Sequence, residues 1–234
     1  MLRLLSKMYT KKASGAAFTF ILFVALSSVL VQFVSPYADD LRGAVHLESG
    51  GQHPSLKHWF GTDAAGRDLF TLTIYAGLSS LKVAIAVVLL SVVIGVPIGM
   101  FSGVSSKKTD DVLMRIVDGF LAFPPLMLPL IITSVLGPSL NNVIIGISMS
   151  WFPWYVRIAR SQAMIILSSG YVSVSKSMGA GKLHIIKKHI FPNSIGSVLV
   201  QGTIDAGYAI LTAAGLSFIG LGARHPEVEW GLLL

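Results

Sequence analysis

The stretch LSSLKVAIAVVLLSVVIGVPIGMF, residues 78–101, is an apolar run long enough to cross a lipid bilayer as one helix. A transmembrane helix needs about 20 predominantly apolar residues to span roughly 30 Å of hydrocarbon. The charged residue in this run, Lys82, stands near one end, and Gly95, Pro97 and Gly99 near the other end predict a kink or close helix packing. The run therefore indicates an integral membrane protein.

Four further apolar blocks flank this run. The composition agrees with a membrane protein, since 53% of the 234 residues are hydrophobic and only 12% are charged, whereas soluble domains carry about 25% charged residues. We expect an all-α polytopic transmembrane helical bundle. Its five predicted spans are residues 14–34, 78–101, 112–136, 143–158 and 195–221. Breaks are expected at Phe123-Pro124-Pro125 and at Pro129 in the third span and at Pro153 in the fourth. The last span is expected to pack closely against neighbouring helices through its small residues, Gly196, Gly202, Gly207, Gly215 and Gly220.

Both ends of the chain bear on the number of spans. The first block follows a basic head of Arg3, Lys7, Lys11 and Lys12, but it exceeds the usual apolar core of a cleavable signal and no Ala-x-Ala follows it. We expect a retained span with its N-terminus in the cytoplasm. The last residues, 231–234, begin another apolar run, so either the chain is incomplete or the architecture is unusual.

The basic residues that give the chain its net charge of +7 are unevenly distributed between the two predicted sides of the membrane. Most Lys and Arg fall in segments that this topology places inside, as the positive-inside rule requires, and this explains the basic excess without nucleic acid. The absence of cysteine excludes disulfides and thiolate metal sites. Residues 1–76 are expected to form a tail, a span and an extracytoplasmic loop, and residues 77–234 a transmembrane domain with a cytoplasmic loop at 171–193.

That cytoplasmic loop, YVSVSKSMGAGKLHIIKKHIFPN, is here named the basic segment. Its Gly-Ala-Gly-Lys lacks the first glycine and the final Ser or Thr of a phosphate-binding loop, so its glycines predict a turn between short helices. Residues 172–175 alternate as a strand does, whereas Leu183, Ile186 and Ile190 share one helical face. This apolar ridge fits either the groove of a partner protein or lipid headgroups, and composition does not separate the two.

Asp205 is an ionisable residue inside an apolar span, where charge is costly and function is the default hypothesis. It predicts either a place in a substrate path or a buried partner for a hydroxyl or a cation. Arg115 and Asp118, one helical turn apart, predict an ion pair within a helix. The six histidines lack metal-ligand spacing and are expected to be solvated, and no Gly-x-Ser-x-Gly occurs, so neither a metal site nor catalysis is expected.

The loop between the first two spans contains the sequence HWFGTDAAGRDLF. Thr62 or Asp63 is suited to cap a short helix beginning at Ala64. Trp59 and Phe60 are suited to anchor the loop at the outer membrane interface. Taken alone, these residues predict a loop close to the membrane and no chemistry.

Three motifs, together with the basic segment, resemble a known family. They are WFGTDAAGRD at 59–68, MRIVD at 114–118 followed by LAFP at 121–124, and GLSFIGLG at 215–222. They are similar to motifs of the inner-membrane permease subunits of ATP-binding-cassette importers, in the dipeptide, oligopeptide and nickel branch. The resemblance covers most of the chain from about His58 to its end.

The resemblance implies a type I importer permease (MetI-like) fold with six spans, so we expect a sixth span beyond residue 234. It also implies that the basic segment folds as two short helices that dock into a cleft of an ATPase subunit. Gly179 and Pro192 match the family pattern, whereas Ser173-Val174-Ser175 replaces its Glu-Ala-Ala. The residues expected to couple to the ATPase are Ser173, Ser175, Gly179, Ala180, Leu183, Ile186 and Pro192.

The same resemblance implies the partners: a second, similar permease, two ATPase subunits and an extracytoplasmic solute-binding protein. ATP and Mg²⁺ are expected on the ATPases, so this chain is not expected to be an enzyme. Asp205, Phe123 and Pro124 are expected on the translocation path. The expected substrate is a short peptide, with nickel or a metal chelate second. A stand-alone channel or a proton-coupled carrier, favoured by Asp205, is the alternative from another class.

Overall fold

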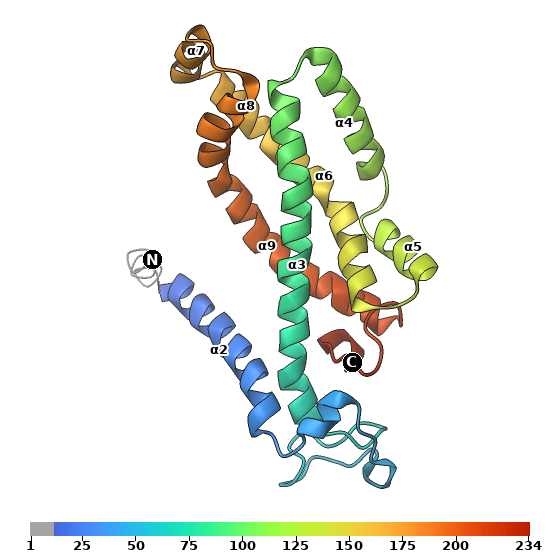
Figure 1. Cartoon of the computed structure of the whole chain (residues 1–234). Helices are drawn as coiled ribbons and strands as arrows, with labels where there is room; N and C mark the ends of the chain where they lie inside the picture. The colour runs from blue at the N-terminus through green and yellow to red at the C-terminus, as the bar shows by residue number, and fades with distance from the viewer. Residues whose placement is uncertain (1–11) are drawn as a thin grey trace. The chain divides into compact units, whose positions relative to one another are not determined.

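The computed structural model describes residues 12–234, and their regular structure is helical (Figure 1). The helices are α2 (Lys12–Val34), α3 (Leu69–Val104), α4 (Lys107–Leu121), α5 (Met127–Leu136), α6 (Leu140–Leu167), α7 (Gly170–Ser177), α8 (Lys182–Ile185) and α9 (Phe191–Phe218). A π-helical turn at Ile186–Ile190 joins α8 to α9, and short 3-10 turns lie at Ala38–Arg42, Leu47–Ser49 and Trp230–Leu232. The all-α prediction is confirmed, and the basic residues Arg3, Lys7 and Lys11 lie outside the described part.

The structure confirms one of the breaks predicted at prolines. The break expected at Phe123-Pro124-Pro125 divides the third predicted span into α4 and α5, because the chain leaves helical structure around Pro124 and Pro125 and resumes it at Met127. The break expected at Pro129 is wrong, since α5 continues through this residue. The predicted interruption at Pro153 is wrong, since α6 continues through this residue. Membrane helices tolerate proline where neighbouring groups satisfy the freed backbone carbonyl. By length and composition alone, α2 and α3 are able to cross a bilayer, and the number of crossings stays a prediction.

The chain forms two compact units, which are described separately. One unit joins residues up to Lys82 to the last residues, Ala223–Leu234, and the other comprises Val83–Gly222. In the first unit α2 and the start of α3 are linked by the Ser28 hydroxyl, which donates to the carbonyl oxygen of Ile74 over 2.7 Å.

The loop between α2 and α3 in the first unit is built around two buried carboxylates. Asp40 accepts the backbone N–H of Asp68 over 2.7 Å, and its other oxygen lies 3.0 Å from Nε2 of His46. Oδ1 of Asp68 lies 3.0 Å from Nδ1 of His58, and His58 is only 5% exposed. The expectation that every histidine is solvated is therefore wrong at His58, because this ring is needed to satisfy a carboxylate removed from water.

The short helix predicted from Ala64 is also absent. Asp63 Oδ1 accepts the backbone N–H groups of Ala65 and Arg67, both over 2.9 Å, which closes a tight turn. Gly66 within this turn has a φ of +79°, a left-handed conformation that cannot continue a right-handed helix. Asp63 is thus a turn-forming residue, and Trp59 and Phe60 remain exposed.

In the second unit α3 and α6 pack closely along a stripe of glycines. A Cβ added at Gly95 would lie 2.5 Å from the carbonyl oxygen of Phe152, and one at Gly103 would lie 2.7 Å from the Cβ of Ala163. A side chain at either position would force the helices apart, so glycine permits their approach. The prediction of close packing near the end of the second span is confirmed.

The glycines of α9 behave differently from one another. At Gly202 a Cβ would lie 3.0 Å from Val88 Cγ1, so this position is packed against α3. At Gly196, Gly207 and Gly215 a Cβ would meet no atom of residues 12–234 within 4 Å. Close packing within the chain is therefore confirmed only at Gly202.

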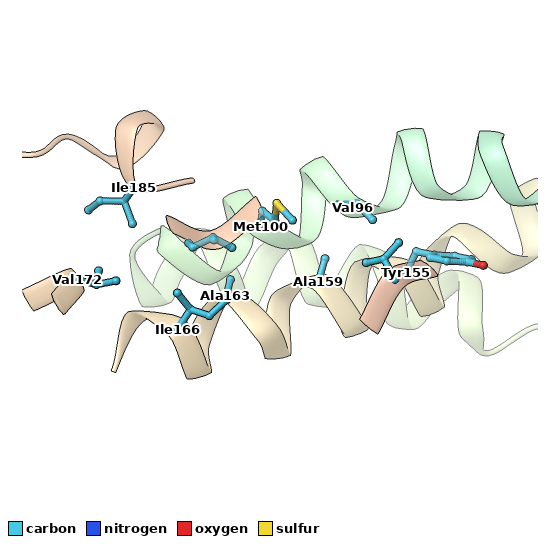
Figure 2. Packing of buried hydrophobic residues seen from close by; sticks show 10 residues of the cluster. Val96, Met100, Tyr155, Ala159, Ala163, Ile166, Val172 and Ile185 are labelled. Atoms are coloured by element: carbon cyan, nitrogen blue, oxygen red, sulfur yellow. The ribbon is translucent and has the colours of Figure 1, made fainter. Parts of the chain in front are cut away.

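A cluster of buried apolar side chains, here named the central cluster, holds the second unit together (Figure 2). It joins α3, α6, α7, α8 and α9 through residues that include Tyr155 at one end and Val172 and Ile185 at the other. Its members are Val96, Met100, Tyr155, Ala159, Ala163, Ile166, Val172, Ile185, Ile190 and Val198. The basic segment is thereby fixed to the bundle by packed side chains.

Candidate functional site

The basic segment folds as two short helices separated by a glycine turn, as the family resemblance implied. Figure 1 shows α7 and α8 at the same end of the second unit as the turn between α3 and α4. The strand-like alternation predicted at residues 172–175 is wrong, because these residues lie within α7. Burial of Val172 in the central cluster overrides an alternating pattern only four residues long.

The turn between α7 and α8 depends on Gly179. Its φ of +88° is in the left-handed region, which residues other than glycine rarely adopt. Gly181, two positions later, has an ordinary φ of −73° as it precedes α8. Both glycines are exposed, and a Cβ at either would meet nothing within 4 Å in the described chain. The conformational requirement for glycine is therefore confined to Gly179.

The apolar ridge predicted at Leu183, Ile186 and Ile190 is wrong as a single surface. Ile190 is fully buried in the central cluster and Ile186 is partly buried against it, whereas Leu183 is 63% exposed. The π turn at Ile186–Ile190 shifts the helical register, so residues that share one face of a regular α-helix separate here.

A different set of side chains forms the exposed surface of the basic segment. Met178 is 83% exposed, and Leu183, Val174 and Tyr171 are also exposed, beside the cations of neighbouring lysines such as Lys182. An apolar surface of this kind in a short, anchored element fits a protein partner.

The remaining predicted coupling residues lie close to this surface. Ser173 is exposed on α7, whereas Ser175 is partly buried with its Oγ 3.3 Å from Nε2 of His189. Ala180 is partly buried against the central cluster, and Pro192 is exposed in the first turn of α9. Ser175 therefore helps to hold α7 against the π turn, and Ser173 is the more accessible of the two serines.

Near the basic segment α4 is tied to α6 by ion pairs that the sequence did not predict. Arg160 donates two hydrogen bonds to the carboxylate of Asp110, over 2.6 and 2.5 Å, and Ser102 donates a third over 2.5 Å. The hydrogen bonds from Arg160 hold the pKa of the Asp110 carboxyl below its ordinary value, although burial opposes them.

The predicted pair of Arg115 and Asp118 is wrong. Asp118 instead accepts a hydrogen bond over 2.6 Å from Arg157, which lies on α6. The amphipathic α4 turns the carboxylate of Asp118 toward that neighbouring helix, so a contact between helices replaces the pair within α4. Sequence spacing identifies only partners within the same helix.

Asp205 lies on α9 and points toward α6. It accepts a hydrogen bond from the Tyr155 hydroxyl over 2.6 Å and one from Gln201 Nε2 over 2.8 Å. Figure 2 shows the Tyr155 ring at one end of the central cluster with its hydroxyl oxygen outermost. The prediction that Asp205 is a partner for a hydroxyl is therefore confirmed.

The same carboxylate lines an open cleft of about 710 Å³, here named the Asp205 cleft. The cleft is lined by Pro125, Leu126, Trp151, Trp154, Ile158, Gln201, Asp205, Tyr208 and Thr212. Phe123 and Pro124, which were predicted on the same path as Asp205, do not line this cleft, whereas Pro125 and Leu126 do. The aromatic lining was missed because Trp151, Trp154 and Tyr208 come from two helices distant in sequence.

The family is established by comparison with known proteins. The family model described as "Binding-protein-dependent transport system inner membrane component" matches residues 95–234. The chain belongs to this permease family. A member of the family is a membrane component of an importer that works with other transporter subunits, and the apolar helices of this permease agree with that setting.

Several curated relatives are similar over most of this permease. It is 38% identical over 223 residues to the probable D,D-dipeptide transport system permease protein DdpC of Escherichia coli (strain K12), covering 95% of the chain and 75% of that protein. It is 40% identical over 183 residues to the dipeptide transport system permease protein DppC of Alkalihalophilus pseudofirmus, covering 78% of the chain and 60% of that protein. The nickel transport system permease protein NikC of Escherichia coli (strain K12) is 36% identical over 218 residues, covering 93% of the chain and 78% of that protein.

The fold has a solved counterpart. A chain of the MetNI methionine ABC transporter, solved in inward facing conformations, matches with a TM-score of 0.58 at 19% sequence identity. The match covers 65% of this permease and 76% of that chain. It supports the MetI-like fold expected from the sequence.

Proposed function

We propose that this permease pairs with a second, similar permease to form the path of an ATP-driven importer of short peptides. The observation that carries the proposal is the basic segment, an exposed pair of short helices fixed by packing to the transmembrane bundle. The peptide substrate is supported by the similarity to DdpC and DppC, which are named as dipeptide transport system permeases. The chain crosses the membrane several times with its N-terminus and the basic segment in the cytoplasm.

In this proposal the basic segment (171–193) docks on one of two ATPase subunits, which bind ATP and Mg²⁺, and a solute-binding protein delivers the peptide from outside. Closure of the ATPases moves the docked helices, and the bundle alternates between outward and inward access. Met178 and Leu183 supply the apolar contact and neighbouring lysines the charge. The permease itself transmits motion and performs no hydrolysis.

The test is reconstitution of the tagged permease with the subunits that co-purify with it, in proteoliposomes supplied with the solute-binding protein. We expect uptake of L-alanyl-L-alanine that requires ATP on the side of the basic segment. Uptake that persists in the permease alone without ATP would contradict the proposal and support a carrier or a channel instead.

A second substrate class has one specific observation in its favour, the 36% identity to NikC. The same vesicles, supplied with ⁶³Ni²⁺ in place of the dipeptide, compare the two classes directly. ATP-dependent accumulation of nickel without that of the dipeptide would replace the peptide assignment and leave the importer mechanism in place.

A further inference from the structure

The carboxyl group of Asp205 meets only neutral partners within the described residues. Both of its hydrogen-bond donors, Tyr155 and Gln201, are neutral groups. None of the ion pairs formed within residues 12–234 includes Asp205. A carboxylate inside a transmembrane bundle is costly unless it faces a polar cavity or meets a positive charge. Its two donors orient the carboxylate and leave it available to a cation.

The walls of the Asp205 cleft suit one kind of cation. Trp151, Trp154 and Tyr208 line the cleft together with the carboxylate, and Trp154 and Tyr208 are exposed. The faces of aromatic rings attract ammonium groups, most strongly at tryptophan. A carboxylate beside aromatic faces therefore provides both an anionic partner and a cation–π surface for an ammonium group.

A bare divalent metal ion fits the cleft poorly. Metal ions such as Ni²⁺ are held by several imidazole, thiolate or carboxylate ligands. Asp205 is the only Asp, Glu or His among the residues that line the cleft, and no group of three or more potential metal ligands occurs in the described part of the chain. The volume of about 710 Å³ is also far larger than an ion needs and lies in the range of small-molecule sites.

We infer that the Asp205 cleft binds the free α-ammonium group of the transported peptide, with Asp205 as its anionic partner and Trp151, Trp154 and Tyr208 around it. This inference rests on the proposed function, because it assigns part of the path to the recognition of an N-terminus. Tyr155 and Gln201 act as positioning residues that hold the carboxylate toward the cleft. Selection then occurs within the membrane as well as at the solute-binding protein.

The test measures binding to the purified transporter complex in nanodiscs, without the solute-binding protein. The two probes are L-alanyl-L-alanine and N-acetyl-L-alanyl-L-alanine, which differ in the ammonium charge. We expect the wild type to bind the free dipeptide about 10-fold more tightly than the acetylated dipeptide, because one charge-assisted contact provides about that factor. Asp205→Asn should reduce this preference to less than about two-fold, whereas Asp205→Glu should retain most of it.

Asp111→Asn is the matched control, because it removes an exposed carboxylate outside the cleft and should keep the full preference. If Asp205 had a purely structural role, Asp205→Asn would weaken the binding of both probes by the same factor. An unchanged ratio of the two affinities in this variant therefore overturns the inference. Equal binding of the two probes to the wild type also overturns it, because the ammonium group would then contribute nothing to the affinity.

Trp154→Leu provides a second variant if Asp205→Asn does not assemble. Removal of this exposed ring should weaken the binding of the free dipeptide by a larger factor than the binding of the acetylated one. Equal factors would again overturn the inference. ATP-dependent uptake by the wild type is measured in parallel, so that failure of the ammonium site is distinguished from failure of the importer assignment.

Discussion

Replacement of Gly179 by alanine tests whether the turn of the basic segment transmits motion. The φ of Gly179 is +88°, a conformation that costs an L residue about 1–2 kcal/mol. No atom of the described chain lies within 4 Å of an added Cβ, so backbone strain is the whole local effect. This free energy lowers the ratio of the native turn to competing conformations by about 5–30-fold. If docking requires that turn, the apparent affinity for the ATPase falls by at most the same factor.

Gly181→Ala is the matched control, because Gly181 is equally open and has a φ of −73° that alanine adopts without strain. Both variants are reconstituted with the ATPases, and dipeptide uptake and ATPase stimulation by the loaded binding protein are measured at limiting ATPase concentration. We expect uptake to fall by more than about two-fold and by at most about 30-fold in Gly179→Ala, and by less than about two-fold in Gly181→Ala. Equal activity of the two variants, with equal insertion in the membrane, would refute the coupling role of this turn.

Three further predictions concern stability. Gly103→Leu should lower the thermal stability of the detergent-solubilised complex by an amount equivalent to about 1–3 kcal/mol, because its side chain overpacks the α3–α6 contact, whereas Gly119→Leu, at an open position, should not. Asp110→Asn should lower the free energy of unfolding by about 1–3 kcal/mol at pH 7, as measured by denaturant unfolding. Since the folded pKa of Asp110 lies below its usual 3.8, the wild-type advantage is present above that value and is lost as pH falls through the folded pKa. His58→Phe should increase the rate of proteolysis in the loop between α2 and α3, because it removes the partner of a buried carboxylate. His53→Phe, at an exposed position of the same loop, should leave that rate unchanged.

The sequence predicted the helical class because long apolar blocks reflect the thickness of the bilayer. It failed where the outcome depends on neighbours. A break was predicted at both Pro124 and Pro153, yet the chain leaves helical structure only around Pro124, and α6 continues through Pro153. Asp118 meets Arg157 of another helix rather than Arg115 of its own. Such choices depend on which helix lies beside the residue, and no pattern within one helix contains that information.

The candidate site was partly predictable for the same reason. Gly179 was identified from its place in a family pattern, and its positive φ agrees with a turn. Asp205 was identified because a charged residue in an apolar block is rare. The aromatic residues around it were not identified, since Trp154 and Tyr208 resemble ordinary membrane-helix residues until α6 and α9 are packed together.

The central cluster connects the two candidate sites within one compact unit. Val172 and Ile185 anchor the basic segment at one end, and at the other end Tyr155 donates its hydroxyl proton to the hydrogen bond with Asp205. A packed interior resists compression, so a displacement of α7 is expected to move the bundle as a body rather than be absorbed locally. A flexible loop on the same helices would dissipate that displacement. In the proposed mechanism the burial of Val172 and Ile185 matters as much as the exposure of Met178, because one side of the basic segment packs against the bundle and the other side is available to an ATPase.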